Sequence, residues 1–151
     1  MDSQTSPTGA LDFQVLLTNL DTGVVVHDLD ARVLLCNNAA AAMLGLPSDQ
    51  LIGRDDHDPI WQFLYADGLP LPVDDYPVNQ VRKHRKPLRD FVAGIVRPDL
   101  PDPIWVQVNA YPELTPSRDI KHVVVTFTNI TSRKETEQAL RTSEAHYRAL
   151  I

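Results

Sequence analysis

The sequence predicts an α+β fold, in which a five-stranded antiparallel sheet carries short helices on one face, with an N-terminal amphipathic helix and a C-terminal helix. Three observations predict it. Short runs rich in branched residues are bounded by turn-forming residues, as in strands. The last three runs are joined by "RPDLPDP" and "PELTPSRD", whose Pro, Asp and Ser favour an antiparallel meander. Helix-favouring segments stand between the second and third runs, so helices are expected to cover one face.

The five strands follow from these runs. "GVVVHD" and "RVLLCN" are separated by "LDA", which predicts a hairpin over residues 23–37. The later three strands are expected over residues 88–96, 104–111 and 120–130. Residues 54–76 are dense in Asp and Pro and show no regular pattern, so no strand is expected there.

Three internal helices fill the space between the strands. "NAAAAMLG" is rich in helix formers and should end at Gly45. "PSDQLIG" predicts a single turn, with Ser48 as its cap and Gly53 after its end. Residues 76–86 form the third, because Pro77 suits a first helical position.

Both ends of the chain are expected to extend beyond the sheet. Residues 1–10 contain Ser, Thr, Pro and Gly and predict a disordered leader, while residues 11–20 predict a short amphipathic helix. At the other end, Ser132 and Glu135 fit a capping box that would begin a long helix. Apolar positions at the two ends could form a homodimer interface. The candidates are Phe13, Leu16, Leu17, Leu20, Leu140 and Tyr147.

Bulk properties exclude several classes of protein. The chain has 151 residues, enough for one ordinary core, and a net charge of -6, which argues against a nucleic-acid partner because phosphate binding needs clustered Lys and Arg. Its single cysteine, Cys36, excludes an internal disulfide. No window reaches the ~20 apolar residues of a membrane span. We expect a cytoplasmic protein without membrane contact.

The element order and several strings resemble the PAS sensory domain. "DGLPLPVDDYPV" is similar to the acidic, proline-punctuated segment before that family's last core helix, and "KPLRDFVAGIVRPD" and "IWVQVNAYPE" are similar to the strands after it. "VVVTFTNIT" resembles the closing strand, with Asn129 where the family usually has Asp. The resemblance covers residues 11–131. It leaves residues 132–151 as a linker helix, whose end, "RTSEAHYRALI", resembles the start of a second PAS domain.

The resemblance implies a sensory and regulatory module. PAS domains bind a small ligand, or none, between the sheet and the short helices, and the C-terminal helix passes the state to a histidine kinase or a cyclic-dinucleotide enzyme such as a diguanylate cyclase. The apolar residues expected in the pocket are Val26, Leu34, Met43, Val81, Phe91, Val125 and Phe127. They are equally expected as plain core. The expected signal relay is Asn129, Ile130 and Thr131. The alternative is a ligand-free homodimerisation scaffold.

The residues that PAS cofactors require are not where the family places them. A flavin photoreceptor of this family carries its reactive cysteine on a helix, whereas Cys36 lies on the predicted hairpin. A haem-binding member has a histidine within the last core helix, whereas His84 ends that helix beside Lys83 and Arg85, where a solvated cap is expected. We therefore expect neither flavin nor haem, and the cofactor is left unknown.

No other motif predicts chemistry. "RDDHD" over residues 54–58 gathers three carboxylates and a histidine, which are metal-ligand types, but neighbouring side chains of an extended segment diverge, so a solvated turn is the better interpretation. The chain lacks a glycine-rich phosphate loop and a recognisable nucleophile with its base. We expect neither a metal site nor an enzyme in this segment.

Overall fold

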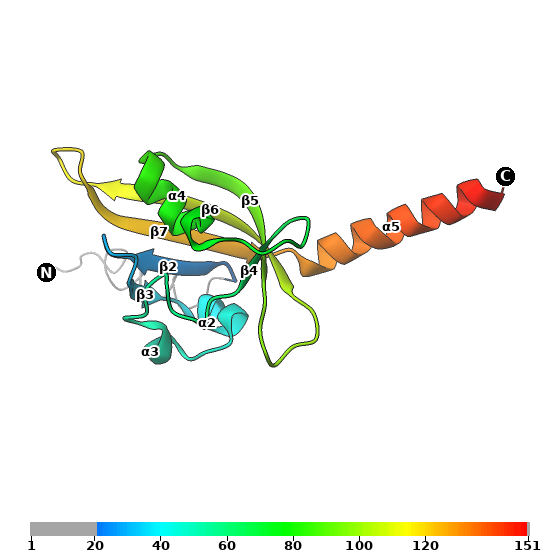
Figure 1. Cartoon of the computed structure of the whole chain (residues 1–151), viewed down its shortest axis with the longest axis horizontal. Coiled ribbons are helices and arrows are strands. Elements are labelled where there is room, and N and C mark those ends of the chain that lie inside the picture. Colours follow the sequence, from blue (N-terminus) through cyan, green and yellow to red (C-terminus); the bar gives the residue numbers. More distant parts are fainter. Residues whose placement is uncertain (1–20, 151) are drawn as a thin grey trace, which may run out of the picture.

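The computed structural model describes residues 21–150, and these form an antiparallel sheet of six strands in the order β3-β2-β7-β6-β5-β4 (Figure 1). The strands are β2 (Gly23–His27), β3 (Val33–Cys36), β4 (Phe63–Tyr65), β5 (Leu88–Ile95), β6 (Ile104–Leu114) and β7 (Ile120–Asn129). The predicted α+β class, hairpin and meander are confirmed. The predicted number of five strands is wrong.

The sixth strand, β4, lies in the segment for which no strand was predicted. It has only three residues and extends the sheet through Phe63 opposite Ile95 of β5. Leu64 also forms an isolated bridge with Pro70. A strand this short is too brief to show a period of two, and its Asp- and Pro-rich surroundings conceal it.

The helices are short except for the last. They are α2 (Asn38–Leu44), α3 (Ser48–Leu51), the 3-10 helix η1 (Val73–Asp75), α4 (Pro77–His84) and α5 (Thr131–Leu150). Figure 1 shows α5 extending away from the sheet at one end of the fold. No helix in the described part of the chain is long and apolar enough to cross a membrane.

Local sequence explains where the helices begin and end. Asn37 caps α2: its Oδ1 accepts from the Ala40 and Val24 amides at 3.0 and 2.9 Å, which also ties the helix to β2. Gly45 ends α2 with a φ of 87°, which a residue with a side chain adopts at a cost. Pro77 opens α4 as predicted. Ser48 does not cap α3, because it is already the first helical residue and Pro47 precedes it.

The start of α5 also differs from the prediction. The helix begins at Thr131, so Ser132 lies within its first turn instead of capping it. The amide of Thr131 donates to Oδ1 of Asn129 at 2.9 Å. The Asn129 side chain therefore pairs the first amide of the helix, a donor that would otherwise have no partner within the helix. The predicted leader and the helix over residues 11–20, with Phe13, Leu16, Leu17 and Leu20, lie outside the described residues.

The core forms where alternate residues of the central strands face the helices. Val25 lies opposite Val125, Val108 opposite Phe127, and Ala93 opposite Val106, and all of these residues are buried. Because side chains in a strand alternate between faces, this register places one apolar surface against α2, η1 and α4. The fold thereby positions a space between sheet and helices.

Candidate functional site

An apolar cavity of about 90 Å³ lies between the inner face of the sheet and the elements that cover it. All six strands contribute to its wall. Typical lining residues are Val25, Ala93, Val106, Val108, Val125 and Phe127. Such a wall offers mainly dispersion contacts, so the arrangement suits a small, largely apolar molecule.

Three aromatic side chains close one side of the cavity. Trp61 and Phe63 stack with ring centroids 6.0 Å apart, and Phe63 meets Tyr76 edge-on at 4.9 Å. The indole Nε1 of Trp61 donates to the backbone oxygen of Asp55 at 2.7 Å, which fixes the ring relative to the loop before it. The irregular segment over residues 54–76 is therefore a structured wall of the cavity.

His27 contributes a polar group to this apolar wall. Its Nδ1 is buried and has no hydrogen-bond partner among the described residues. Burial lowers the pKa of His27 to about 4, against smaller opposing effects of the Val123 backbone and of Asp28 and Asp56. The imidazole is therefore neutral at pH 7.

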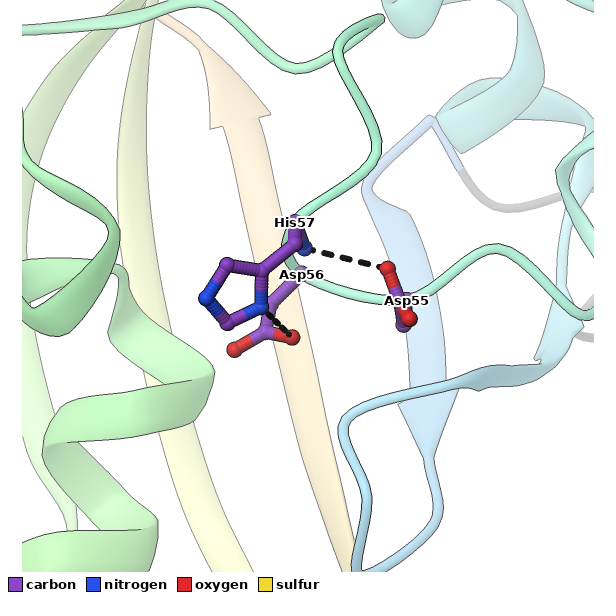
Figure 2. Close-up of side chains that lie close together, drawn as sticks. All are labelled: Asp55, Asp56 and His57. Carbon is purple, nitrogen blue, oxygen red and sulfur yellow. Dashed lines mark hydrogen bonds and ion pairs between the residues drawn. The ribbon is translucent and has the colours of Figure 1, made fainter.

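The loop after α3 brings Asp55, Asp56 and His57 together, with one potential ligand atom of each within 4.8 Å of the others (Figure 2). Figure 2 shows that His57 bonds to both neighbours: its amide donates to Asp55 at 3.1 Å, and its Nδ1 lies 3.0 Å from Asp56. Asn79 of α4 donates to the other Asp56 oxygen at 2.9 Å. These bonds anchor the loop to α4.

The same contacts set the charge state of Asp56. Burial opposes its ionisation, but hydrogen bonds from Asn79 and His57 outweigh that cost, so the pKa of the carboxyl lies below its usual value. Arg82 lies 3.9 Å away and offsets the charge. His57 itself is exposed. The donor types fit a cation, yet the geometry is that of a loop whose carboxylates already have partners.

The predicted pocket residues fall into three groups. Val125 and Phe127 lie on the cavity wall. Val26 pairs with Val124 and lies on the face opposite that of Val25, and Leu34 is 43% exposed. Their neighbours Val25 and Val33 line the cavity in their place. A one-residue offset exchanges the two faces of a strand, and runs such as "VVV" and "LL" contain no alternation to fix the face.

The other three predicted pocket residues are part of the core without lining the cavity. Met43 of α2 and Val81 of α4 are buried, and Phe91 packs against the same cluster. Leu44 and Val78, on the same two helices, line the cavity. A helix buries a broad stripe, and apolar character alone does not separate the part that faces a cavity from the part that packs against the sheet.

Sequence reasoning missed His27 and the aromatic wall. Trp61, Phe63 and Tyr76 fall within the segment for which no regular pattern was found. With Tyr65, they make four aromatic residues in 16 positions, which is a usable signal that the segment packs on the core. His27 was placed in the predicted hairpin without a functional role. Its position at the end of a run of valines on β2 was the signal that it belongs to the strand.

The residues weighed for cofactors lie away from this wall. Cys36 ends β3, where burial raises the pKa of its thiol and its Sγ lies 3.8 Å from the Ser48 oxygen. His84 is exposed at the end of α4. An apolar cavity of roughly 150 Å³ binds benzene. At about 90 Å³, the cavity in this conformation is smaller than a flavin ring system or a haem requires.

The predicted relay residues join the sheet to α5 through Trp105 of β6. The amide of Ile130 donates to the Trp105 oxygen at 2.8 Å, and the Trp105 amide donates to Oγ1 of Thr131 at 3.0 Å. Lys134, in the first turn, places its Nζ 4.4 Å from the centroid of the Trp105 ring. Together with the cap from Asn129, these contacts fix the start of α5 on the strand beside the cavity.

Comparison with solved structures shows the same fold elsewhere. The PAS domain of a Colwellia psychrerythraea protein matches with a TM-score of 0.61 at 14% identity, covering 81% of this chain and 97% of that one. The PAS domain of Bordetella pertussis BvgS matches with a TM-score of 0.54 at 20% identity, covering 89% and 97%. The PAS domain of nitrogen regulation protein NR(II) from Vibrio parahaemolyticus matches with a TM-score of 0.55 at 14% identity, covering 77% and 95%.

Comparison at the level of sequence gives the family. No curated protein sequence matches the chain. The family model described as "PAS domain" matches residues 21–132, which is most of the chain and includes the whole sheet, the cavity and the start of α5. The chain therefore belongs to the PAS domain family, whose members are sensory and signalling modules.

Proposed function

We propose that this chain is a sensory PAS module of a cytoplasmic signalling protein, which binds a small molecule in the cavity and relays its presence through α5. The observation that carries the proposal is the continuity of β7. This strand lines the cavity with Val125 and Phe127 and runs through Asn129 into the first turn of α5. A displacement of the two side chains would therefore act on the start of the helix.

A second route supports the same direction of relay. Val106 and Val108 of β6 also line the cavity, and Trp105, the residue before Val106, bonds to Ile130 and Thr131. Strands β6 and β7 thus approach the start of α5 from the cavity as a paired unit. A ligand shifts this unit only if it binds two arrangements with different affinity.

We assign residues 11–131 to the sensory domain, residues 1–10 to a leader, and residues 132–151 to a linker that joins it to an output. The output we propose is a histidine kinase or a diguanylate cyclase in the same protein, with the end of α5 as the start of a second PAS domain. Support comes from the exposed course of α5 beyond its first turn, because a helix that the rest of the described chain leaves uncovered is available to another domain (Figure 1).

Xenon is a suitable probe for the binding step, because it enters small apolar cavities and makes no hydrogen bonds. Methyl-resolved NMR under xenon pressure should shift the methyl signals of Val25, Val106 and Val125, while those of the exposed Leu29 and Leu114 stay in place. Uniform small changes at all five residues would contradict a specific cavity site. Native mass spectrometry of the purified chain would then reveal a co-purifying small molecule.

The second candidate is a ligand-free homodimerisation scaffold, favoured by the surface of α5. Leu140 and Tyr147 are seven residues apart and 59% and 66% exposed, so they lie on the same side of the helix without cover from the described residues. Two parallel copies of α5 would bury them against each other. Ser and Glu substitutions at these positions, Leu140→Ser and Tyr147→Glu, should convert a dimer to a monomer in light scattering if this interface forms.

The two candidate functions differ in how dimerisation and α5 should respond to a ligand in the cavity. A scaffold dimerises regardless of any cavity ligand, whereas a sensor changes α5 when the cavity is filled. Light scattering with and without xenon separates them, since the mass measured for a scaffold should not depend on xenon. The double variant of α5 leaves the cavity intact, so xenon shifts at Val106 and Val125 should persist in it.

A further inference from the structure

We propose that His27 is the polar anchor of the cavity, and that it selects a small, uncharged ligand that carries one hydroxyl group. This inference rests on the proposed ligand-binding function and specifies its chemistry. The geometry that carries it is the placement of a buried, unpartnered Nδ1 on a largely apolar wall.

An unpartnered polar atom in such a place is costly. Buried side-chain nitrogens are almost always hydrogen-bonded, and leaving one without a partner costs about 1–3 kcal/mol. Among the described side chains that are not exposed, His27 Nδ1 is the one buried nitrogen or oxygen atom without a hydrogen-bond partner. A ligand group that bonds to it would recover that cost. The wall therefore favours a ligand with a polar group at this point over a purely apolar one.

The neutral state of His27 narrows the class of ligand. A neutral imidazole has one nitrogen that donates and one that accepts, and a hydroxyl can pair with either because it does both. An anionic ligand is disfavoured because the imidazole carries no charge and Asp56 also lies on the wall. A cationic ligand gains little, since Asp56 already accepts from His57 and Asn79 and lies near Arg82.

The size of the cavity limits the apolar part of the ligand. At about 90 Å³ it has less room than the roughly 150 Å³ cavity that accommodates benzene. A short-chain alcohol of about three carbons is therefore the matching probe. Val25, Val106 and Val125 would contact its carbon chain while His27 bonds to its hydroxyl.

The test compares 1-propanol with 1-chloropropane, which is similar in shape but has no O–H group. Both are titrated into the intact chain and into two variants, His27→Leu and His27→Gln, with binding followed by methyl NMR of cavity residues. In the wild type, the ratio of alcohol to chloroalkane affinity should exceed that in His27→Leu by on the order of tenfold, the effect of one hydrogen bond. His27→Gln, which keeps a donor and an acceptor, should restore part of the preference.

The outcomes separate this inference from the proposed function. If both compounds and xenon bind but His27→Leu leaves the ratio unchanged, the cavity is a binding site and the anchor role of His27 is overturned. If none of the three probes binds to the wild type, the proposed function itself is contradicted. Retained shifts from xenon in both variants would show that each variant still folds around the cavity.

Discussion

Acid should destabilise this chain through His27, and replacing that residue should remove the effect. The pKa of His27 is about 4 in the folded chain, against about 6.5 in the unfolded chain. Between these values the unfolded state binds more protons, so the free energy of unfolding falls as the pH falls from 6.5 to 4 and levels off below. From pH 7 to pH 5, this linkage amounts to about 2 kcal/mol.

Urea denaturation at pH 7 and pH 5 measures the difference. The free energy of unfolding of the wild type should fall by about 2 kcal/mol between the two conditions. That of His27→Leu should fall far less, because the buried imidazole at position 27 is gone. His146→Gln removes an exposed histidine from α5 and should keep the wild-type difference. His27→Gln provides a second uncharged variant if Leu impairs folding. An equal loss of unfolding free energy in the wild type and in both His27 variants would show that His27 is not the source of the acid sensitivity.

Three further substitutions test the packing and the junction by urea denaturation. Gly45→Ala should lower the free energy of unfolding more than Gly53→Ala does. Both positions have a positive φ, but only at Gly45 would a Cβ lie 2.7 Å from the Arg97 side chain. Equal losses of free energy would contradict an effect of this contact. Val106→Ala should lower the free energy of unfolding by about 2 kcal/mol and, by enlarging the cavity, strengthen the binding of probes larger than 1-propanol. Unchanged binding would show that Val106 does not line the cavity. Thr131→Val should lower the free energy of unfolding by about 1 kcal/mol and speed amide exchange in the first turn of α5. Exchange at the wild-type rate would show that the Thr131 hydroxyl does not hold the helix.

Much of the fold was predictable because strong local signals agreed with the final packing. Gly45 and Pro77 mark helix boundaries through backbone constraints that hold in any context. The hairpin and the meander follow from branched runs between turn-forming residues. The number of strands was not predictable in the same way, because β4 is held by pairing with β5 and not by a pattern of its own.

The apolar character of the cavity was predictable from the sequence, but the set of residues that line it was not. Val125 and Phe127 alternate with Thr126 and Thr128, so the sequence predicts which face of β7 is apolar. The "VVV" run of β2 has no such alternation, and the wrong neighbour was chosen there. The predicted relay residues lie together at one junction, yet the role of Trp105 in fixing that junction depends on the pairing of β6 with β7, which local sequence does not specify.

If the chain is a sensor, filling the cavity should change the start of α5. Amide hydrogen exchange at Ile130, Thr131 and Lys134, measured by NMR with and without saturating xenon, tests it directly. Exchange at these amides should change when the Val106 and Val125 methyl signals shift, while exchange at the amides of the β2–β3 turn should stay the same. Shifted cavity methyls with unchanged exchange throughout the first turn of α5 would contradict it.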